Sequence, residues 1–251
     1  MIRHALILAA GRGERMQPLT GHTPKPLLQA GGKRLIEWHL ERLAAIGVSD
    51  VVINVSHLAE QFPAALGDGS RWNLRISYSL EGPQPLETGG GMLHALERLG
   101  DDAFIVANGD IWTDFEVAKL ALGSADVAHL VMVDNPAHVP QGDFHLDPQG
   151  RIAAQGSPRL TYAGLGVYRP GILAHWQEDL AVAGVNWEGD TPARFALVHV
   201  LRAAIRRGEV SGHHHRGIWT DVGTPQRLDE LDRLLREQAE PGCLPGRADP
   251  G

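Results

Sequence analysis

The segment LILAAGRGERMQPLTGHTPKPLL, residues 6–28, decides how the chain folds, because a short apolar run leads directly into a glycine-rich loop. The run HALILAA over residues 4–10 ends at Gly11, which predicts a buried strand followed by a loop. Arg15 and Lys25 then place two cations close to that loop. The pattern leaves three uses open: a dinucleotide site, a triphosphate site for hydrolysis, or a phosphate site for another reaction.

Strand and helix patterns alternate along the rest of the chain. Apolar runs over residues 50–56 and 103–110 predict further buried strands, and helical spacing begins at Ile36 and again over 57–66 and 87–99. Later patterns predict strands near 74–79, 129–135 and 160–170, and a closing helix after TDVGTP. This alternation predicts an α/β fold, a three-layer α/β/α sandwich with a mostly parallel, Rossmann-like sheet.

The domain organisation is predicted to be simple. With 251 residues, 43% of them hydrophobic, the chain can bury one large core, and no repeat or linker divides it. We expect a single domain over residues 1–238. Residues 239–251 have too little apolar content to pack and are expected to be a disordered tail. The only cysteine, Cys243, lies in that tail, so no disulfide framework is expected.

Composition and charge exclude several classes of partner. The formal net charge of −7 argues against nucleic acid and anionic membranes, which both favour a basic surface. Neither a signal peptide nor an apolar run of about 18 residues is present, so a cytoplasmic protein is expected. A small anionic substrate remains compatible, because a few local cations can bind it.

Two common phosphate-binding loops do not fit the glycine-rich segment. A dinucleotide fingerprint needs a third glycine where Met16 stands, and Pro18 follows soon after, so an NAD-dependent oxidoreductase loses its main support. The P-loop sequence glycine-lysine-Ser/Thr is also missing. The remaining interpretation is a loop whose backbone amides, with Arg15 and Lys25, hold a polyphosphate. A simple strand–helix turn with solvated cations is the alternative.

Five sequence blocks together resemble one enzyme family. LAAGRGERMQPLTGHTPKPLL is followed by LETGGG (86–91), NGD (108–110), GDF (142–144) and WTDVGTP (219–225). In this order they resemble the signature of the sugar-phosphate nucleotidyltransferases. Glu14, where Thr or Ser is usual, together with LETGGG and the short GDF block, is most similar to the N-acetylmuramate 1-phosphate α-uridylyltransferases of peptidoglycan recycling.

The resemblance implies a reaction. UMP would pass from UTP to N-acetylmuramic acid 1-phosphate, giving UDP-N-acetylmuramic acid and pyrophosphate. The same chemistry with GTP and mannose 1-phosphate, or with another sugar 1-phosphate, stays open as an alternative. A catalytically inactive nucleotide-sensing subunit would have lost its phosphate and metal positions, whereas Arg15, Lys25, Asp110 and Asp221 are all present. Partners would be UTP and a sugar 1-phosphate, and the protein a monomer or small homo-oligomer.

The resemblance also assigns roles to residues. Arg15 and Lys25 would be catalytic, facing the leaving pyrophosphate and the α-phosphate respectively. The implied nucleotide-binding residues are Gly11, Gly13, Glu14, Arg15, Lys25, Glu87 and Gly89. Asn108 and Asp143 would bind the sugar. Asp110 and Asp221 would hold Mg²⁺ together with phosphate oxygens. Taken alone, each of these two aspartates also fits a helix cap or a turn.

Overall fold

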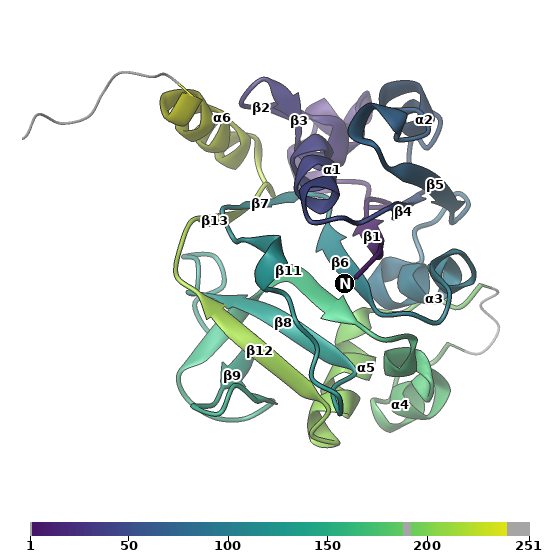
Figure 1. The fold of residues 1–251 in the computed structure, drawn as a ribbon, viewed down its shortest axis with the longest axis vertical. Coiled ribbons are helices and arrows are strands. Elements are labelled where there is room, and N and C mark those ends of the chain that lie inside the picture. Colours follow the sequence, from purple (N-terminus) through teal and green to yellow (C-terminus); the bar gives the residue numbers. More distant parts are fainter. Residues whose placement is uncertain (1, 188–191, 240–251) are drawn as a thin grey trace, which may run out of the picture.

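The computed structural model describes residues 2–187 and 192–239, which fold around a nine-stranded sheet (Figure 1). The strand order is β10-β9-β11-β6-β1-β4-β5, and β8 lies between β11 and β12. The strands are β1 (His4–Leu8), β4 (Asp50–Val55), β5 (Arg75–Leu80), β6 (Phe104–Asn108), β8 (Ala128–Val133), β9 (Phe144–Leu146), β10 (Ile152–Ala153), β11 (Arg159–Tyr168) and β12 (Val210–His215).

Helices and two short ribbons complete the fold. The ribbons are β2 (Gln29–Ala30) with β3 (Lys33–Arg34), and β7 (Ile111–Thr113) with β13 (Trp219–Asp221). The α-helices are α1 (Leu35–Ala45), α2 (Gln61–Leu66), α3 (Glu87–Leu99), α4 (Trp176–Val182), α5 (Leu197–Arg206) and α6 (Pro225–Ala239). The 3-10 turns are η1 (Glu14–Met16), η2 (Leu19–Gly21), η3 (Lys25–Leu27), η4 (Ser70–Trp72), η5 (Val117–Lys119) and η6 (Pro170–Leu173).

The predicted α/β class is confirmed, with a parallel half and a mixed half in one sheet. Strands β6, β1, β4 and β5 are all parallel, as a Rossmann-like arrangement requires. Strand β11 is antiparallel to β6, β8 and β9. Strands β10 and β11 both run antiparallel to β9, which lies between them, so the mixed half of the sheet begins at the β11–β6 pair. The sequence over 160–170 indicated the strand but not its direction.

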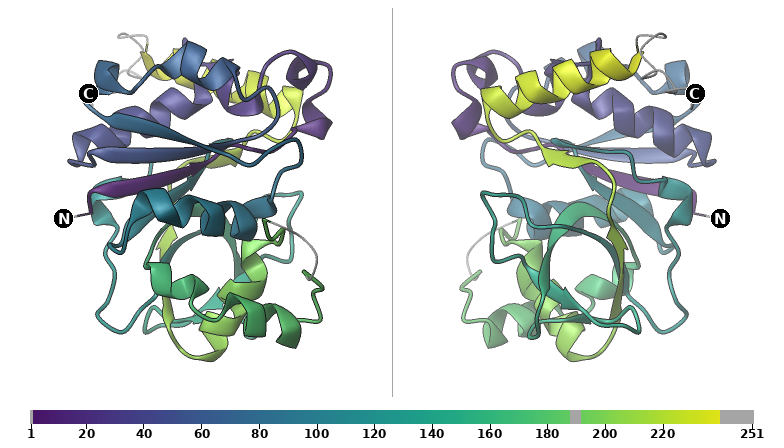
Figure 2. Two further views of the ribbon diagram at one scale, coloured as in Figure 1. Left: turned by 90° about the vertical axis from the view of Figure 1, so that its right-hand side faces the viewer. Right: turned by 90° about the vertical axis from the view of Figure 1, so that its left-hand side faces the viewer.

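Alternation along the strands produces two apolar cores, one on each face of the sheet. Ala5 and Ile7 of β1 face the core that α1 and α2 cover, whereas Leu6 faces the core beneath α3 and α5. Successive side chains of a strand point to opposite faces, so fully apolar strands need helices on both sides. Figure 2 shows α1 and α2 on one side of the sheet and α3, α4 and α5 on the other.

The helix expected over residues 57–66 begins only at Gln61. Leu58 has a positive φ of 52°, outside the right-handed helical region, and residues 57–60 form turns. At the other end of the chain α6 runs to Ala239, one residue into the predicted tail. Residues 240–251, with Cys243, lie outside the described residues, and the single-domain boundary stays a prediction. In the described part of the chain, no helix is long and apolar enough to cross a membrane.

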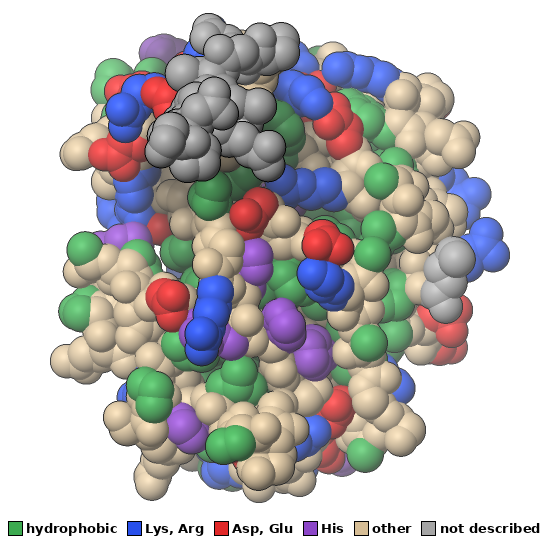
Figure 3. Space-filling model, turned by 60° about the vertical axis from the view of Figure 1, so that its left-hand side comes forward, with side chains coloured by type: hydrophobic (Ala, Val, Ile, Leu, Met, Phe, Trp, Pro, Cys, Tyr) green, Lys and Arg blue, Asp and Glu red, His purple; other side chains and the backbone are tan. Residues whose placement is uncertain are grey.

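The run of three histidines, His213, His214 and His215, forms the end of β12. His214 lies 2.9 Å from Asp134, and His215 lies 2.7 Å from Asp114. Histidine side chains lie beside acidic and basic ones on the face drawn in Figure 3. Across residues 2–187 and 192–239, no group of three or more His, Cys, Asp or Glu side chains is placed to hold a metal ion.

Candidate active site

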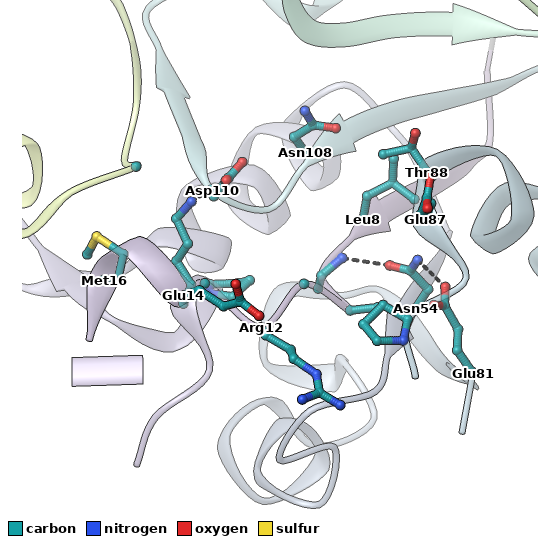
Figure 4. Close-up of a pocket in the computed structure, with 18 of the residues that line it drawn as sticks. Leu8, Arg12, Glu14, Met16, Asn54, Glu81, Glu87, Thr88, Asn108 and Asp110 are labelled. Atoms are coloured by element: carbon teal, nitrogen blue, oxygen red, sulfur yellow. Dashed lines mark hydrogen bonds and ion pairs between the residues drawn. The ribbon is translucent and has the colours of Figure 1, made fainter. Parts of the chain in front are cut away.

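A cavity of about 940 Å³ opens at the carboxyl ends of the parallel strands, where open α/β sheets bind ligands (Figure 4). The loop after β1 forms one wall, and the segment leading into α3 forms another. Figure 4 shows Glu87 and Thr88 across the cavity from Glu14. Of the predicted site residues, the lining contains Gly11, Gly13, Glu14, Arg15, Lys25, Glu87, Asn108 and Asp110.

The loop after β1 is shaped by Gly13. Its φ is 63°, and a Cβ there would lie 2.9 Å from Cγ2 of Thr20. The Thr20 hydroxyl donates a 2.8 Å hydrogen bond to the Gly13 carbonyl, which closes the loop onto the chain that follows. Within the described residues, the backbone amides of residues 11–13 donate to no other group. Such unpaired amides in a small-residue loop are suited to bind phosphate oxygens.

The two predicted cations occupy different environments. Arg15 is exposed on the cavity lining, and its guanidinium has no hydrogen-bond or ion-pair partner in the described part of the chain. Lys25 is 9% exposed and forms an ion pair with Asp110. Arg15 is therefore free to bind an incoming anion. Lys25 is already held in place by its ion pair with Asp110.

Asp110 immediately precedes β7, and Asp221 ends β13, the strand that pairs with β7 in a short ribbon. The Val222 amide donates a 2.8 Å hydrogen bond to the Asp110 carbonyl, which places the two aspartates close together. Asp221 ends β13 in this ribbon rather than in the main sheet, and its neighbour Gly223 lines the cavity. Oδ1 of Asp221 accepts from Arg227 and lies 3.0 Å from His138.

The donor set of these two aspartates fits a hard cation. Oδ1 of Asp110 and Oδ2 of Asp221 have no hydrogen-bond or ion-pair partner among residues 2–187 and 192–239. Two carboxylates that leave further positions to phosphates and water are a common arrangement for Mg²⁺.

A buried chain of hydrogen bonds connects the two walls of the cavity. The Ala9 amide donates to Asn54 at 2.6 Å, and Asn54 donates to Glu81 at 2.5 Å. The other Glu81 oxygen accepts from the Leu86 amide at 2.7 Å. Burial raises the pKa of Glu81, although the hydrogen bonds from the Leu86 amide and from Asn54 oppose the shift. Asn54 was not among the predicted site residues, although an amide inside the apolar run DVVINVS is a signal that could have identified it.

The first turn of α3 contains one predicted residue on the cavity and one away from it. Glu87 lines the cavity with a φ of 62°, unusual for a residue with a Cβ. Gly89 is buried and does not line the cavity, because the Phe195 ring occupies the space where its Cβ would be. Its amide donates a 2.9 Å bond to the Phe195 carbonyl. Gly89 is thus buried in the packing of α3 and lies outside the lining of the cavity, and its nucleotide-binding role stays a prediction.

The predicted sugar-side residues line a smaller cavity of about 190 Å³ beside the first one. Leu8, Thr88 and Asn108 line both cavities, and Asp143 lines the smaller. Oδ2 of Asp143 accepts a 2.8 Å hydrogen bond from the Tyr162 amide, which orients the carboxylate. Gly164, with a φ of 71°, leaves room for Asn108, since a Cβ there would lie 2.5 Å from Nδ2 of Asn108.

Two arginines of the lining were also missed by the sequence analysis. Arg12 donates to the Pro83 carbonyl at 3.1 Å, and Arg194 donates to the Pro85 carbonyl at 3.2 Å. Arg12 stands between the two glycines of the first loop, which is the signal that could have identified it. Arg194 lies in the irregular second half of the chain, where no motif marked it.

The fold and the site together define a class of protein, an α/β protein with a glycine-rich loop, two cations and two aspartates at the carboxyl edge of its parallel strands. Residues 4–138 match the family model described as nucleotidyl transferase. The chain belongs to this family.

Similar proteins agree with that assignment. The chain is 44% identical over 237 residues to the N-acetylmuramate alpha-1-phosphate uridylyltransferase of Neisseria meningitidis serogroup B, covering 92% of this chain and 97% of that one. It is 34% identical to the protein of the same name from Caulobacter vibrioides, with 93% and 97% covered. The inositol-1-phosphate CTP transferase structure from T. maritima shares the fold, with a TM-score of 0.72, 19% identity, and 96% and 98% covered.

Proposed function

We propose that the protein transfers UMP from UTP to N-acetylmuramic acid 1-phosphate, giving UDP-N-acetylmuramic acid and pyrophosphate, a step of peptidoglycan recycling. The observation that carries this proposal is the 44% identity to a relative named for that activity, over nearly the whole of both chains. The cavities support it, because the larger has a phosphate-binding loop and the smaller has polar groups suited to a sugar.

The chemistry requires neutralisation of charge and alignment more than a protein nucleophile. A phosphate oxygen of the sugar 1-phosphate attacks the α-phosphorus of UTP, the bond from that phosphorus to the bridging oxygen breaks, and pyrophosphate leaves. The amides of residues 11–13 and the guanidinium of Arg15 would hold the β- and γ-phosphates. Lys25, fixed by Asp110, would lie at the α-phosphate, where negative charge increases in the transition state.

We propose that Asp110 and Asp221 hold Mg²⁺ together with phosphate oxygens. The ion, when bound, would neutralise charge on the triphosphate and on the leaving pyrophosphate. The oxygens available for it are Oδ1 of Asp110 and Oδ2 of Asp221. Lys25 pairs with the other oxygen of Asp110, and Arg227 pairs with the other oxygen of Asp221. Each cation orients its carboxylate and offsets part of its negative charge.

A substrate grid tests the proposal. Pyrophosphate release would be measured with Mg²⁺ for UTP, GTP, CTP and dTTP against the 1-phosphates of N-acetylmuramic acid, N-acetylglucosamine, mannose and glucose. We expect a signal for UTP with N-acetylmuramic acid 1-phosphate that exceeds every other combination. A dominant signal for GTP with mannose 1-phosphate would keep the mechanism and overturn the substrates. No signal from folded protein in any combination would overturn the activity itself.

A further inference from the structure

The segment over residues 193–197 lies on the boundary between the two cavities. Arg194 lines the larger cavity, and Leu197 lines the smaller. The Phe195 amide donates to the Leu86 carbonyl at 3.2 Å, and the Leu197 amide donates to the Thr88 hydroxyl at 2.9 Å. Both hydrogen bonds attach the segment to the start of α3. Arg194 therefore projects from a backbone fixed where a nucleotide site meets a sugar site.

Arg194 is held by a partner that can be exchanged. Its Nη2 lies 3.4 Å from Oε1 of Glu87, and the two side chains are 51% and 43% exposed. An ion pair this open to solvent contributes little to stability, so another anion can replace Glu87 at small cost. Glu87 also adopts its left-handed backbone on the cavity wall, and such strain concentrates at functional sites.

The distribution of cations separates Arg194 from the others. Among the described residues that line the two cavities, the cationic side chains are Arg12, Arg15, Lys25 and Arg194. The first three lie on the loop after β1 and its continuation, where the phosphates are expected. The smaller cavity contains the carboxylate of Asp143 but no cation in its described lining. A second anionic group on the sugar would therefore find its cation in Arg194.

We propose that Arg194 binds the carboxylate of the lactyl ether carried by N-acetylmuramic acid 1-phosphate, and that Glu87 occupies this position when no sugar is bound. This inference rests on the proposed function. A guanidinium matches a carboxylate through two parallel N–H donors, which a lysine ammonium does not reproduce. Hexose 1-phosphates without the lactyl group cannot make this contact. Arg194 is thus a residue that selects the sugar.

The test compares two sugars that differ in the lactyl group. The values of kcat and KM would be measured with UTP for the 1-phosphates of N-acetylmuramic acid and N-acetylglucosamine. Where the second turns over too slowly, its inhibition constant against the first replaces KM. For Arg194→Gln we expect kcat/KM on N-acetylmuramic acid 1-phosphate to fall about 10- to 100-fold through KM, the range for loss of a hydrogen bond to a charged group. The fall in kcat/KM for the lactyl-free sugar should be at least about fivefold smaller, because that sugar has no carboxylate to bond the guanidinium.

Two further variants, Arg194→Lys and Arg12→Gln, serve as controls for the comparison of the two sugars. Arg194→Lys retains the charge without the paired donors and should retain part of the discrimination. Arg12→Gln removes another arginine that donates to the 83–85 segment. Arg12 lies on the loop after β1, where the phosphates are expected to bind. This variant should reduce kcat/KM for both sugars by the same factor.

The outcomes separate this inference from the proposed function. If Arg194→Gln, with an unchanged melting temperature, lost activity equally with both sugars, the inference would be overturned and the proposed function would stand. If wild-type protein did not turn over N-acetylmuramic acid 1-phosphate at all, both would be overturned. A selective rise in KM for the lactyl-bearing sugar supports both.

Discussion

At the scale of single residues, each proposed metal ligand is paired with a cation of the protein itself. Asp110 pairs with Lys25, and Asp221 pairs with Arg227. These pairs give each carboxylate a defined orientation before any ligand binds. They also mean that a change at either aspartate affects the neighbouring cation.

We predict that Asp110→Asn and Asp221→Asn each remove most Mg²⁺-dependent pyrophosphate release and leave the fold intact. An amide oxygen is a weaker ligand for Mg²⁺, and each substitution keeps the shape of the side chain, so both variants should still fold cooperatively. Asp229→Asn, an exposed change on α6 outside the cavity lining, is the control. Full activity in either test variant would exclude that residue from the metal site.

A change at Arg15 is expected to act on turnover. Because its guanidinium is exposed and has no partner in the described part of the chain, Arg15→Gln should leave the melting temperature unchanged. Loss of one preorganised donor typically reduces kcat on the order of 10²–10³-fold. Steady-state kinetics with saturating UTP measure the effect. A normal kcat would show that Arg15 does not contact the reacting phosphates.

At the scale of elements, the loop after β1 depends on one glycine more than on its neighbour. Gly13→Ala should destabilise the protein by about 1–2 kcal/mol, because a side chain disfavours its left-handed backbone and the added methyl meets Thr20. Gly11→Ala, where no atom lies within 4 Å of the added methyl, is the matched control. Urea unfolding of both variants measures the difference. Equal stabilities would mean that the loop relaxes freely.

The buried hydrogen-bond chain through Asn54 connects β1, β4, β5 and α3. Asn54→Leu should destabilise the protein by about 2–3 kcal/mol, because it leaves the Ala9 amide and the Glu81 carboxylate without their buried partner. Hydrogen exchange should show the extra opening at Ala9 and Leu86. If hydrogen exchange became faster only in other elements, a linking role for Asn54 would be contradicted.

At the scale of the whole molecule, one buried histidine makes stability depend on pH. Burial, with the nearby Arg42, lowers the pKa of His39 to about 4. The folded protein keeps His39 neutral, whereas the unfolded chain binds a proton below about pH 6.5. The contribution to stability is therefore present above pH 6.5 and is lost as the pH falls toward 4, by about 3 kcal/mol.

The variant His39→Leu tests this linkage. It should flatten the dependence of unfolding free energy on pH between 6.5 and 4, whatever its effect on stability at pH 7. His175→Gln, at an exposed position, should leave the slope unchanged. If His39→Leu kept the wild-type slope, another group would cause the acid destabilisation.

The sequence by itself determined the fold class, the parallel strands and the glycine-rich loop after the first strand. These features depend on local patterns: apolar runs, glycines beside a strand end, and cations close to them in the chain. Arg15, Lys25 and Asp110 lie within or beside such patterns, and the structure brings all three to one cavity.

Only the tertiary structure decided which distant groups meet at the site. The pairing of Lys25 with Asp110, the packing of Gly89 against Phe195 and the placement of Arg194 beside Glu87 all depend on contacts between segments far apart in the chain. The antiparallel direction of β11 against β6 is likewise a pairing between segments about 60 residues apart in the chain, Phe104–Asn108 and Arg159–Tyr168. Local periodicity specifies that a segment is a strand or helix, but partner and direction follow from how whole elements bury their apolar faces together.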